Sequence, residues 1–253
     1  MTRYVDLSLP LRNYQGRPSV LHYRDHRTTA TERGAEYGFD PATLPLPGIH
    51  MAHETYTVGA HQGGTHVDAP WHYGPTTGGR PARTVDELPL DWFRAPGVVL
   101  DLSDAAAGST IRVDAVRVAA DGIDGGIPPG TIVLVRTGAD RYWGSPEYEL
   151  RSPGLSREAV LWLLDRGVRV IGIDAFSLDP PVAPMVQALR EGDAAAYFPA
   201  HLVGREREFC IIERLANLER LPRSGFEVTA FPVLVERGSG GWCRAVAALP
   251  GGP

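Results

Sequence analysis

Residues Gly59–Gly74 read GAHQGGTHVDAPWHYG, and this stretch holds three of the eight histidines of the chain. Its histidines and its carboxylate are His61, His66, His72 and Asp68. Imidazole and carboxylate groups are the side chains that bind Zn²⁺ and Mn²⁺ in proteins. We therefore interpret the stretch as half of a metal site, and we expect a second stretch near His201 to supply the other half.

Alternation along an extended chain brings two of these groups together. Side chains of a strand point to opposite faces in turn, so His66 and Asp68 share one face while Val67 points to the other. An imidazole and a carboxylate on one face are a natural pair of metal ligands. Pro70 interrupts the strand and lets His72 fold back over the site. A hydrogen-bonded polar cluster without metal is the alternative.

The second stretch, Phe209–Leu215, reads FCIIERL. Alternation places Glu213 on an apolar face, where a carboxylate is costly to bury without a partner. A metal cation is one such partner, and Arg205 or Arg214 is the other. The Pro-Ala pair before His201 predicts the start of a short helical turn, because proline is tolerated in the first position of a helix.

Apolar runs around these stretches predict the architecture. Three runs of the chain are rich in Val, Ile and Leu, a composition that suits strands covered on both faces. These runs are Gly97–Leu102, Thr131–Thr137 and Val168–Ile173. Further strands are predicted at Tyr4–Leu9, Phe209–Leu215 and Phe226–Arg237. A helix is predicted over Ser156–Asp165, with Ser156 as its cap and Gly167 after its end. The pattern predicts an α/β fold with a mixed sheet, in one domain over residues 1–253.

Two further features leave alternatives open. Residues 11–53 are polar and irregular, as expected of a lid, of a binding segment or of a surface excursion without a role. This stretch contains Tyr14, Tyr23 and Tyr37 as possible substrate contacts. Asp174 ends the third apolar run and either faces a site or forms a turn.

Composition excludes several classes of protein. The chain has 253 residues, 43% hydrophobic and 22% charged, which is ordinary for a globular protein. The net charge of −5 argues against a nucleic-acid binder, which needs a basic face. No signal-peptide pattern and no apolar run near 18 residues is seen in the sequence, so we expect a cytoplasmic protein without a signal peptide or a membrane span. Cys210 and Cys243 lie in apolar segments and are expected to be free thiols.

The motif GGTHVDAPWH resembles the signature of the cyclase family that includes bacterial kynurenine formamidase and isatin hydrolase. The family pattern is His-x-Gly-Thr-His-x-Asp-x-Pro-x-His. The resemblance extends to YVDLSLPL near the start, to VIGIDAFSLD and to HLVGREREFCIIERLANL, so it covers most of the chain.

This resemblance implies a swivelling β/β/α fold, a site for one or two divalent metal ions, commonly zinc or manganese, and a homodimer or larger assembly. By position, His66 and Asp68 match metal ligands, and Asp68 is able to bridge two ions. His201 and Glu213 match the ligands of the second metal. His72 matches the general acid/base, and an ordinary imidazole pKa near ~6.5 suits proton transfer at neutral pH.

One departure concerns the first ligand. The first histidine of the family pattern lies four residues before the second, but here that position is Gln62, and His61 is one residue too early. In a fully extended chain Gln62, and not His61, would share the face of His66. Either Gln62 replaces a histidine ligand, or a bulge at Gly63–Gly64 brings His61 round.

Together these features predict a metal-dependent hydrolase that cleaves an amide, lactam or ester bond of a small, cyclic or aromatic substrate. The metal would lower the pKa of bound water and polarise the carbonyl, and His72 would protonate the leaving group. Trp71 and Tyr14 are the predicted substrate contacts, although Trp71 alternatively packs without touching substrate. A cyclase or dehydratase with the same site is one alternative function, and a metal-free binding protein is another.

Overall fold

The structure is a computed structural model that describes residues 1–13 and 19–251. The chain divides into two compact units, which are Met1–Pro10 with Gly64–Pro253, and Leu11–Gly63.

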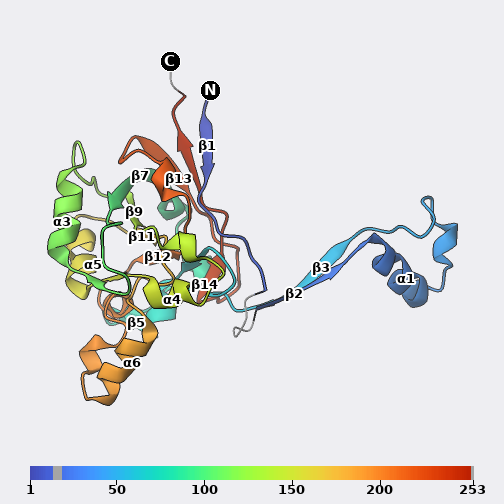
Figure 1. Cartoon of the computed structure of the whole chain (residues 1–253), viewed down its shortest axis with the longest axis horizontal. Coiled ribbons are helices and arrows are strands. Elements are labelled where there is room, and N and C mark those ends of the chain that lie inside the picture. The colour runs from blue at the N-terminus through green and yellow to red at the C-terminus, as the bar shows by residue number, and fades with distance from the viewer. Residues whose placement is uncertain (14–18, 252–253) are drawn as a thin grey trace. The chain divides into compact units, whose positions relative to one another are not determined.

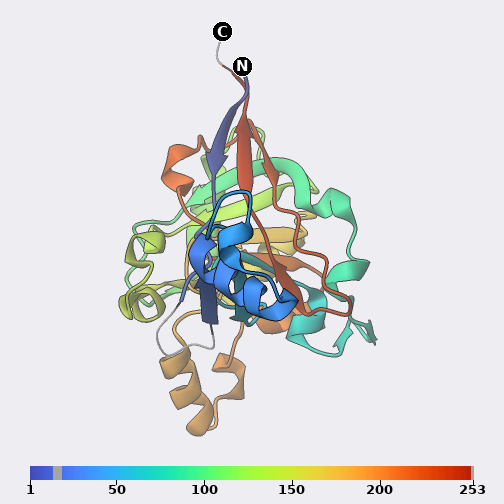
Figure 2. The same ribbon diagram turned by 90° about the vertical axis from the view of Figure 1, so that its right-hand side faces the viewer.

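The larger unit is built on a nine-stranded mixed sheet. In spatial order its strands are β1 (Arg3–Asp6), β15 (Val246–Leu249), β13 (Phe226–Thr229), β7 (Arg94–Asp101), β9 (Ile132–Arg136), β11 (Val170–Ile173), β12 (Cys210–Glu213), β4 (His66–Asp68) and β14 (Gly240–Trp242). The four central strands, β7, β9, β11 and β12, run parallel to one another. The strands on either side pair antiparallel, and Figure 2 shows β1 and β15 side by side near the N-terminus.

Both faces of the central strands are covered, as the three apolar runs predict. In β9, Val133 and Val135 point into one hydrophobic cluster, while Ile132 and Leu134 point into another. The first cluster is covered by α3 (Val113–Asp121) and α5 (Arg157–Leu164), which lie on the same side of the sheet (Figure 1). The predicted helix 156–165 is therefore confirmed, and the Ser156 hydroxyl caps it by accepting a hydrogen bond from Ala159 N at 3.2 Å.

The flanking strands of the curled sheet cover the second hydrophobic cluster. Side chains from the flanking strands, Val5 of β1, Val228 of β13 and Ala247 of β15, share it with Ile132 and Leu134 of the centre. These antiparallel strands therefore fold over the face that the helices leave open. The predicted strand 226–237 was too long, because pairing ends at Thr229 and the following apolar side chains, such as the 79% exposed Leu234, lie in a loop.

Short elements complete this unit. They are α2 (Pro70–Tyr73), α4 (Glu147–Arg151), α6 (Val182–Arg190), the strand pairs β5 (Thr76–Thr77) with β6 (Arg80–Pro81) and β8 (Thr110–Ile111) with β10 (Gly154–Leu155), and the 3-10 turns Val85–Glu87, Leu90–Phe93, Ala139–Tyr142, Ala194–Ala196, His201–Arg205 and Leu218–Arg220. Across residues 1–13 and 19–251, no helix combines the length and the apolar character that a membrane crossing requires.

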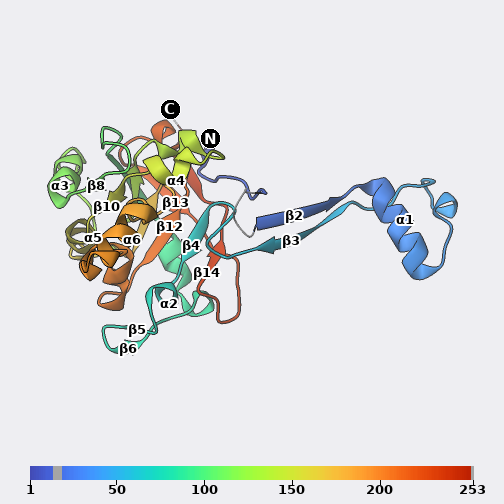
Figure 3. The ribbon, with the colours of Figure 1, turned by 60° about the horizontal axis from the view of Figure 1, so that its bottom comes forward.

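The smaller unit corrects the prediction of an irregular segment over residues 11–53. It contains a hairpin of β2 (Ser19–Arg24) with β3 (His53–Val58), and between them in the chain α1 (His26–Tyr37) and the 3-10 turn Pro41–Thr43 (Figure 3). Asp25 caps α1 by accepting hydrogen bonds from Arg27 N and Thr28 N. The sequence of α1, HRTTATERGAEY, has no apolar stripe, so only its caps distinguish it from a loop.

Candidate metal centre

Strand β4 positions two of the predicted ligands. It pairs with β12 on one side and β14 on the other, and both His66 and Asp68 are 0% exposed. Val67 points to the opposite face, into the second hydrophobic cluster. Alternation therefore places the imidazole and the carboxylate on one face of a strand that neighbours hold on both edges.

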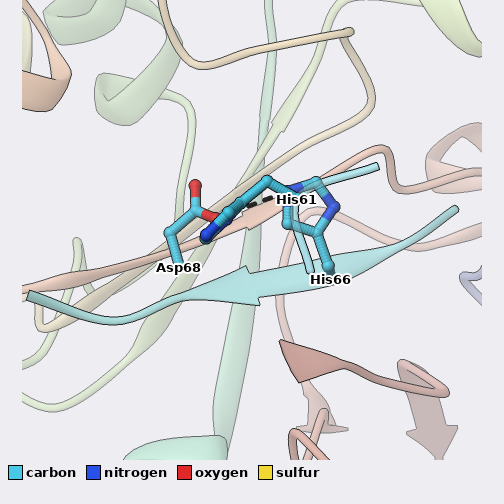
Figure 4. A group of neighbouring side chains, drawn as sticks. All are labelled: His61, His66 and Asp68. Atoms are coloured by element: carbon cyan, nitrogen blue, oxygen red, sulfur yellow. Dashed lines mark ion pairs between the residues drawn. The ribbon is translucent and has the colours of Figure 1, made fainter. Parts of the chain in front are cut away.

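Strand β12 brings Glu213 to the same place. Its register sets Glu213 directly opposite His66, and side chains of directly opposed residues lie on one face. His66 Nε2 lies 3.4 Å from Asp68 Oδ1 and 3.6 Å from Glu213 Oε2. A dashed line in Figure 4 marks the approach of His66 to Asp68.

His201 closes the group from a separate element. It opens the 3-10 turn His201–Arg205, as the Pro-Ala pair before it predicts, and it is 7% exposed. His201 Nε2 lies 3.5 Å from Asp68 Oδ2 and 3.4 Å from Glu213 Oε1. Each of the two imidazole nitrogens therefore approaches both carboxylates.

Hydrogen bonds at the far side of each ring set the tautomer. His66 Nδ1 lies 3.0 Å from the carbonyl oxygen of Gly64, and His201 Nδ1 lies 2.5 Å from Asp179 Oδ2. Because a carbonyl or carboxylate oxygen accepts, Nδ1 carries the hydrogen and Nε2 presents a lone pair. Orientation of a ligating imidazole by such a partner is the usual arrangement in metal sites.

The donor set fits a divalent cation. Two lone pairs and two carboxylates face one another at 3.4–3.6 Å, which is longer than an N–H···O bond. Nitrogen and oxygen ligands about 2.0–2.2 Å from a tetrahedral Zn²⁺ lie roughly 3.3–3.6 Å apart. Ligand atoms of Asp68, His72 and His201 also lie within 4.8 Å of one another.

A proton competes for the same position. Burial alone lowers the pKa of His201, but the hydrogen bond with Asp179 and the nearby carboxylates of Asp68 and Glu213 outweigh it and raise that pKa well above its usual value. The site thus requires positive charge between its carboxylates, from a cation or from a proton on His201.

Asp179 is a site residue that the sequence reasoning missed. It is 1% exposed, and its carboxylate accepts from Ala200 N at 2.7 Å and His201 N at 3.0 Å, in addition to the imidazole. One carboxylate therefore fixes both the backbone and the ring of His201. No alternation pattern reaches Asp179, because it lies in the loop between β11 and α6. Its signals in the sequence were its place at the end of the VIGIDAFSLD block that resembles the cyclase family, and its neighbours Pro180 and Pro181.

The predicted arginine partners of Glu213 lie elsewhere. Arg205 Nε donates to the carbonyl of Tyr73 at 2.7 Å, and Arg214 contacts Phe176. Glu213 Oε1 instead accepts from Leu178 N at 2.8 Å. Within the described part of the chain, the ion pairs of Glu213 are those with His66 and His201.

His72 lies at the solvent side of the group. It belongs to α2, which begins at Pro70, and it is exposed. Its ring meets the His201 ring edge-on, with centroids 5.7 Å apart. His72 therefore combines solvent access with proximity to the buried imidazole of His201.

The two possible first ligands, His61 and Gln62, stand at the end of the smaller unit. The expectation that alternation extends back to Gln62 was wrong, because β4 begins only at His66 and a turn precedes it. Gln62 N donates to Gly59 O at 3.0 Å, and its side chain folds over Gly59. Gly63 has φ +89°, a left-handed conformation that glycine adopts readily. Figure 4 draws His61 with His66 and Asp68.

The remaining predicted residues have other surroundings. Trp71 is 44% exposed, and its backbone N donates to Arg83 O at 3.0 Å. Tyr14 lies outside the described residues. Asp174 is a structural residue, because its carboxylate accepts from Thr137 N, Thr137 Oγ1 and Gly138 N.

Comparison with known proteins places this chain in a family. Residues 5–180 match the family model named Cyclase. Isatin hydrolase of Roseibium aggregatum is 31% identical over 222 residues, which are 80% of this chain and 77% of that protein. Kynurenine formamidase of Bordetella petrii is 28% identical over 183 residues, which are 72% of this chain and 74% of that protein. The chain belongs to the cyclase family of metal-dependent hydrolases.

Solved structures confirm the predicted α/β fold with a mixed sheet. Isatin hydrolase A from Ralstonia solanacearum superposes with a TM-score of 0.72 at 24% identity, over 98% of this chain and 92% of that one. An isatin hydrolase bound to the product analogue thioisatinate superposes with a TM-score of 0.71 at 23% identity, over 99% of this chain and 93% of that one.

The relatives are enzymes, so the protein is an enzyme of this class, and the metal-free binding protein is not supported.

Proposed function

We propose that the protein hydrolyses an amide, lactam or ester bond of a small cyclic or aromatic molecule, with one or two divalent metal ions held by His66, Asp68, His201 and Glu213. The observation that carries the proposal is the set of four distances of 3.4–3.6 Å between two imidazole nitrogens and two carboxylates. When bound, a divalent metal lowers the pKa of water and polarises a carbonyl.

Buried and exposed side chains have different roles in the proposed chemistry. The four ligands are buried, so their charges act in a low dielectric and hold a cation strongly. Exposed His72 is our proposed general acid/base, because it can exchange protons with solvent and deliver one to a leaving nitrogen or oxygen. Asp179 keeps the His201 lone pair directed at the site.

We propose His61 as a further ligand in preference to Gln62. Support comes from Gly63, whose left-handed conformation lets the chain turn before β4, and from the Gln62 side chain, which folds over Gly59. Zinc and manganese are the proposed ions, because both accept imidazole and carboxylate ligands. Trp71 and Tyr14 remain the proposed substrate contacts.

The names of the relatives guide the choice of substrates. Isatin is a cyclic amide, and the relatives named kynurenine formamidase indicate an N-formyl amide. We therefore propose C–N bond hydrolysis as the main activity. The reverse reaction, ring closure with loss of water, uses the same groups, so cyclase activity is the alternative. A cytoplasmic homodimer or larger assembly remains part of the proposal.

The test combines metal analysis with assays on formylkynurenine, isatin and simple lactones. We expect stoichiometric zinc or manganese in purified protein and hydrolysis of at least one substrate class. His66→Ala and Asp68→Ala should lose both metal and activity, whereas His26→Ala, a surface histidine of α1, should keep both. Full activity of a metal-free Asp68→Ala protein would refute the mechanism.

A second variant separates proton transfer from metal binding. His72→Gln should retain the metal and lose about 10²- to 10⁴-fold in kcat, the usual range for a general acid/base. An unchanged kcat would remove His72 from the mechanism. Loss of the metal in this variant would make His72 a ligand instead.

A further inference from the structure

Arg214, the residue directly after the proposed ligand Glu213, has an unusual backbone. Its φ is +60°, in the left-handed region that non-glycine residues other than Asn and Asp rarely adopt. The surrounding structure holds this conformation, because Arg214 N donates to Ala175 O and Arg214 O accepts from Thr65 Oγ1. Residues kept in such conformations cluster at functional sites.

The Arg214 side chain is a buried cation without an acidic partner. The residue is 7% exposed. Its guanidinium lies 4.6 Å above the Phe176 ring, and its one hydrogen bond within residues 1–13 and 19–251 is a long one of 3.4 Å from Nε to Phe176 O. No carboxylate of these residues forms an ion pair with it. Burial of an uncompensated charge is costly, so an anion is the natural complement.

The left-handed turn decides where this cation lies. Adjacent side chains of a strand normally point to opposite faces. Here Glu213 Oε1 accepts from Leu178 N, while Arg214 lies against Phe176, two residues earlier in the same loop. The conformation of Arg214 therefore brings a ligand carboxylate and an unneutralised guanidinium to one loop, Phe176–Leu178, beside the metal centre.

We propose that Arg214 is a specificity residue that binds a carboxylate carried by the substrate. A guanidinium presents parallel N–H donors that match a carboxylate in a two-point contact, and its Nη atoms have no partner among the described residues. Phe176 holds the guanidinium plane and lowers the entropy lost on binding. The inference rests on the proposed function for the position of the scissile bond, but not for the binding of the anion.

The kinetic test uses a matched pair of esters, phenyl acetate and 4-acetoxybenzoate, which differ by one carboxylate. Arg214→Asn is the main variant, because asparagine tolerates the left-handed conformation and should keep the fold. We expect its KM for 4-acetoxybenzoate to rise at least tenfold, with kcat and metal content unchanged and phenyl acetate affected less than twofold. Arg214→Lys should be intermediate. Equal effects on both esters, or on neither, would overturn the proposal.

A binding measurement keeps the proposal testable if neither ester is hydrolysed. Benzoate is titrated calorimetrically into the metal-loaded wild type and into Arg214→Asn. We expect at least tenfold weaker binding by the variant. Equal affinity of the two proteins, or no binding by the wild type, would refute the role of Arg214 whatever the outcome for hydrolysis.

Discussion

At the scale of single residues, the candidate centre needs a positive charge to offset its two buried carboxylates. Two buried carboxylates and two imidazole lone pairs converge, and each imidazole is held by an acceptor on its far nitrogen. Asp68 and His66 could be predicted from alternation alone, and Glu213 from its position on an apolar face. Asp179 could not, because its role depends on a loop that returns to His201 from a distant part of the chain.

The role of Asp179 makes a prediction about metal affinity. Asp179→Asn should weaken metal binding about 10- to 100-fold, as loss of such a partner typically does, because His201 loses its orienting acceptor. Competition with a chelator of known affinity measures the change. Asp114→Asn, which alters a largely exposed carboxylate on α3, is the matched control and should bind metal like the wild type. Unchanged affinity of Asp179→Asn would show that His201 is positioned by its backbone alone.

At the scale of helices and strands, caps and apolar patterns explain which elements could be predicted. The helix α5 and the central strands follow from a serine cap and from apolar runs, and both were predictable. The helix α1 was not, because it lacks an apolar stripe, and the loop after Thr229 was not, because apolar residues there continue beyond the last pairing. Local propensity thus identifies elements that bury a face and fails for those that do not.

The cap of α5 gives a direct test of this explanation. Ser156→Ala removes the acceptor for Ala159 N and should lower the free energy of unfolding by about 1 kcal/mol. Urea denaturation of the two proteins measures the difference. Ser224→Ala is the control, because Ser224 forms no side-chain hydrogen bond with the described residues and should change stability little. A similar loss in both variants would mean that the cap contributes nothing specific.

Asp174 follows β11 and accepts hydrogen bonds from the loop after β9, and this buried carboxylate predicts that the stability of the protein depends on pH. Burial raises the pKa of Asp174 from 3.8 to about 7, although hydrogen bonds from Thr137 and Gly138 oppose the rise. Between these values the folded protein binds a proton that the unfolded chain does not. The free energy of unfolding should therefore fall as the pH rises from about 4 to about 7, by at most about 1.4 kcal/mol per pH unit from this group.

Asp174→Asn checks that assignment. The variant lacks the titrating group, so its unfolding free energy should change less steeply over this pH range, even if its absolute stability is lower. Denaturation curves of both proteins at several pH values give the two slopes. Parallel slopes would assign the pH dependence to another group.

At the scale of the whole molecule, the proposed metal centre joins parts that are far apart in the chain. Its residues come from β4, from the turn His201–Arg205 and from β12, and Asp179 precedes α6. A ligand that binds only the folded state stabilises it by mass action. A metal bound at this proposed centre would therefore couple the occupancy of one site to the stability of the central sheet.

Metal removal tests this coupling. Treatment with a chelator should lower the Tm, and restoring zinc or manganese at 1,000 times its Kd should recover about 4 kcal/mol of stability. Differential scanning calorimetry before and after re-addition measures both steps. Asp68→Ala should melt at the same temperature with and without metal. A large metal-dependent shift in that variant would place the binding site elsewhere.

The sequence by itself determined the local chemistry of this protein. Period-2 alternation paired His66 with Asp68, apolar runs marked the buried strands, and the motif around them indicated the cyclase family. Tertiary structure decided what local patterns cannot encode. The register of β12 against β4 set Glu213 opposite His66, a distant loop gave His201 its partner in Asp179, and a left-handed turn placed Arg214 beside Phe176. These contacts join residues tens to more than a hundred positions apart, so only the folding of the chain brings them together.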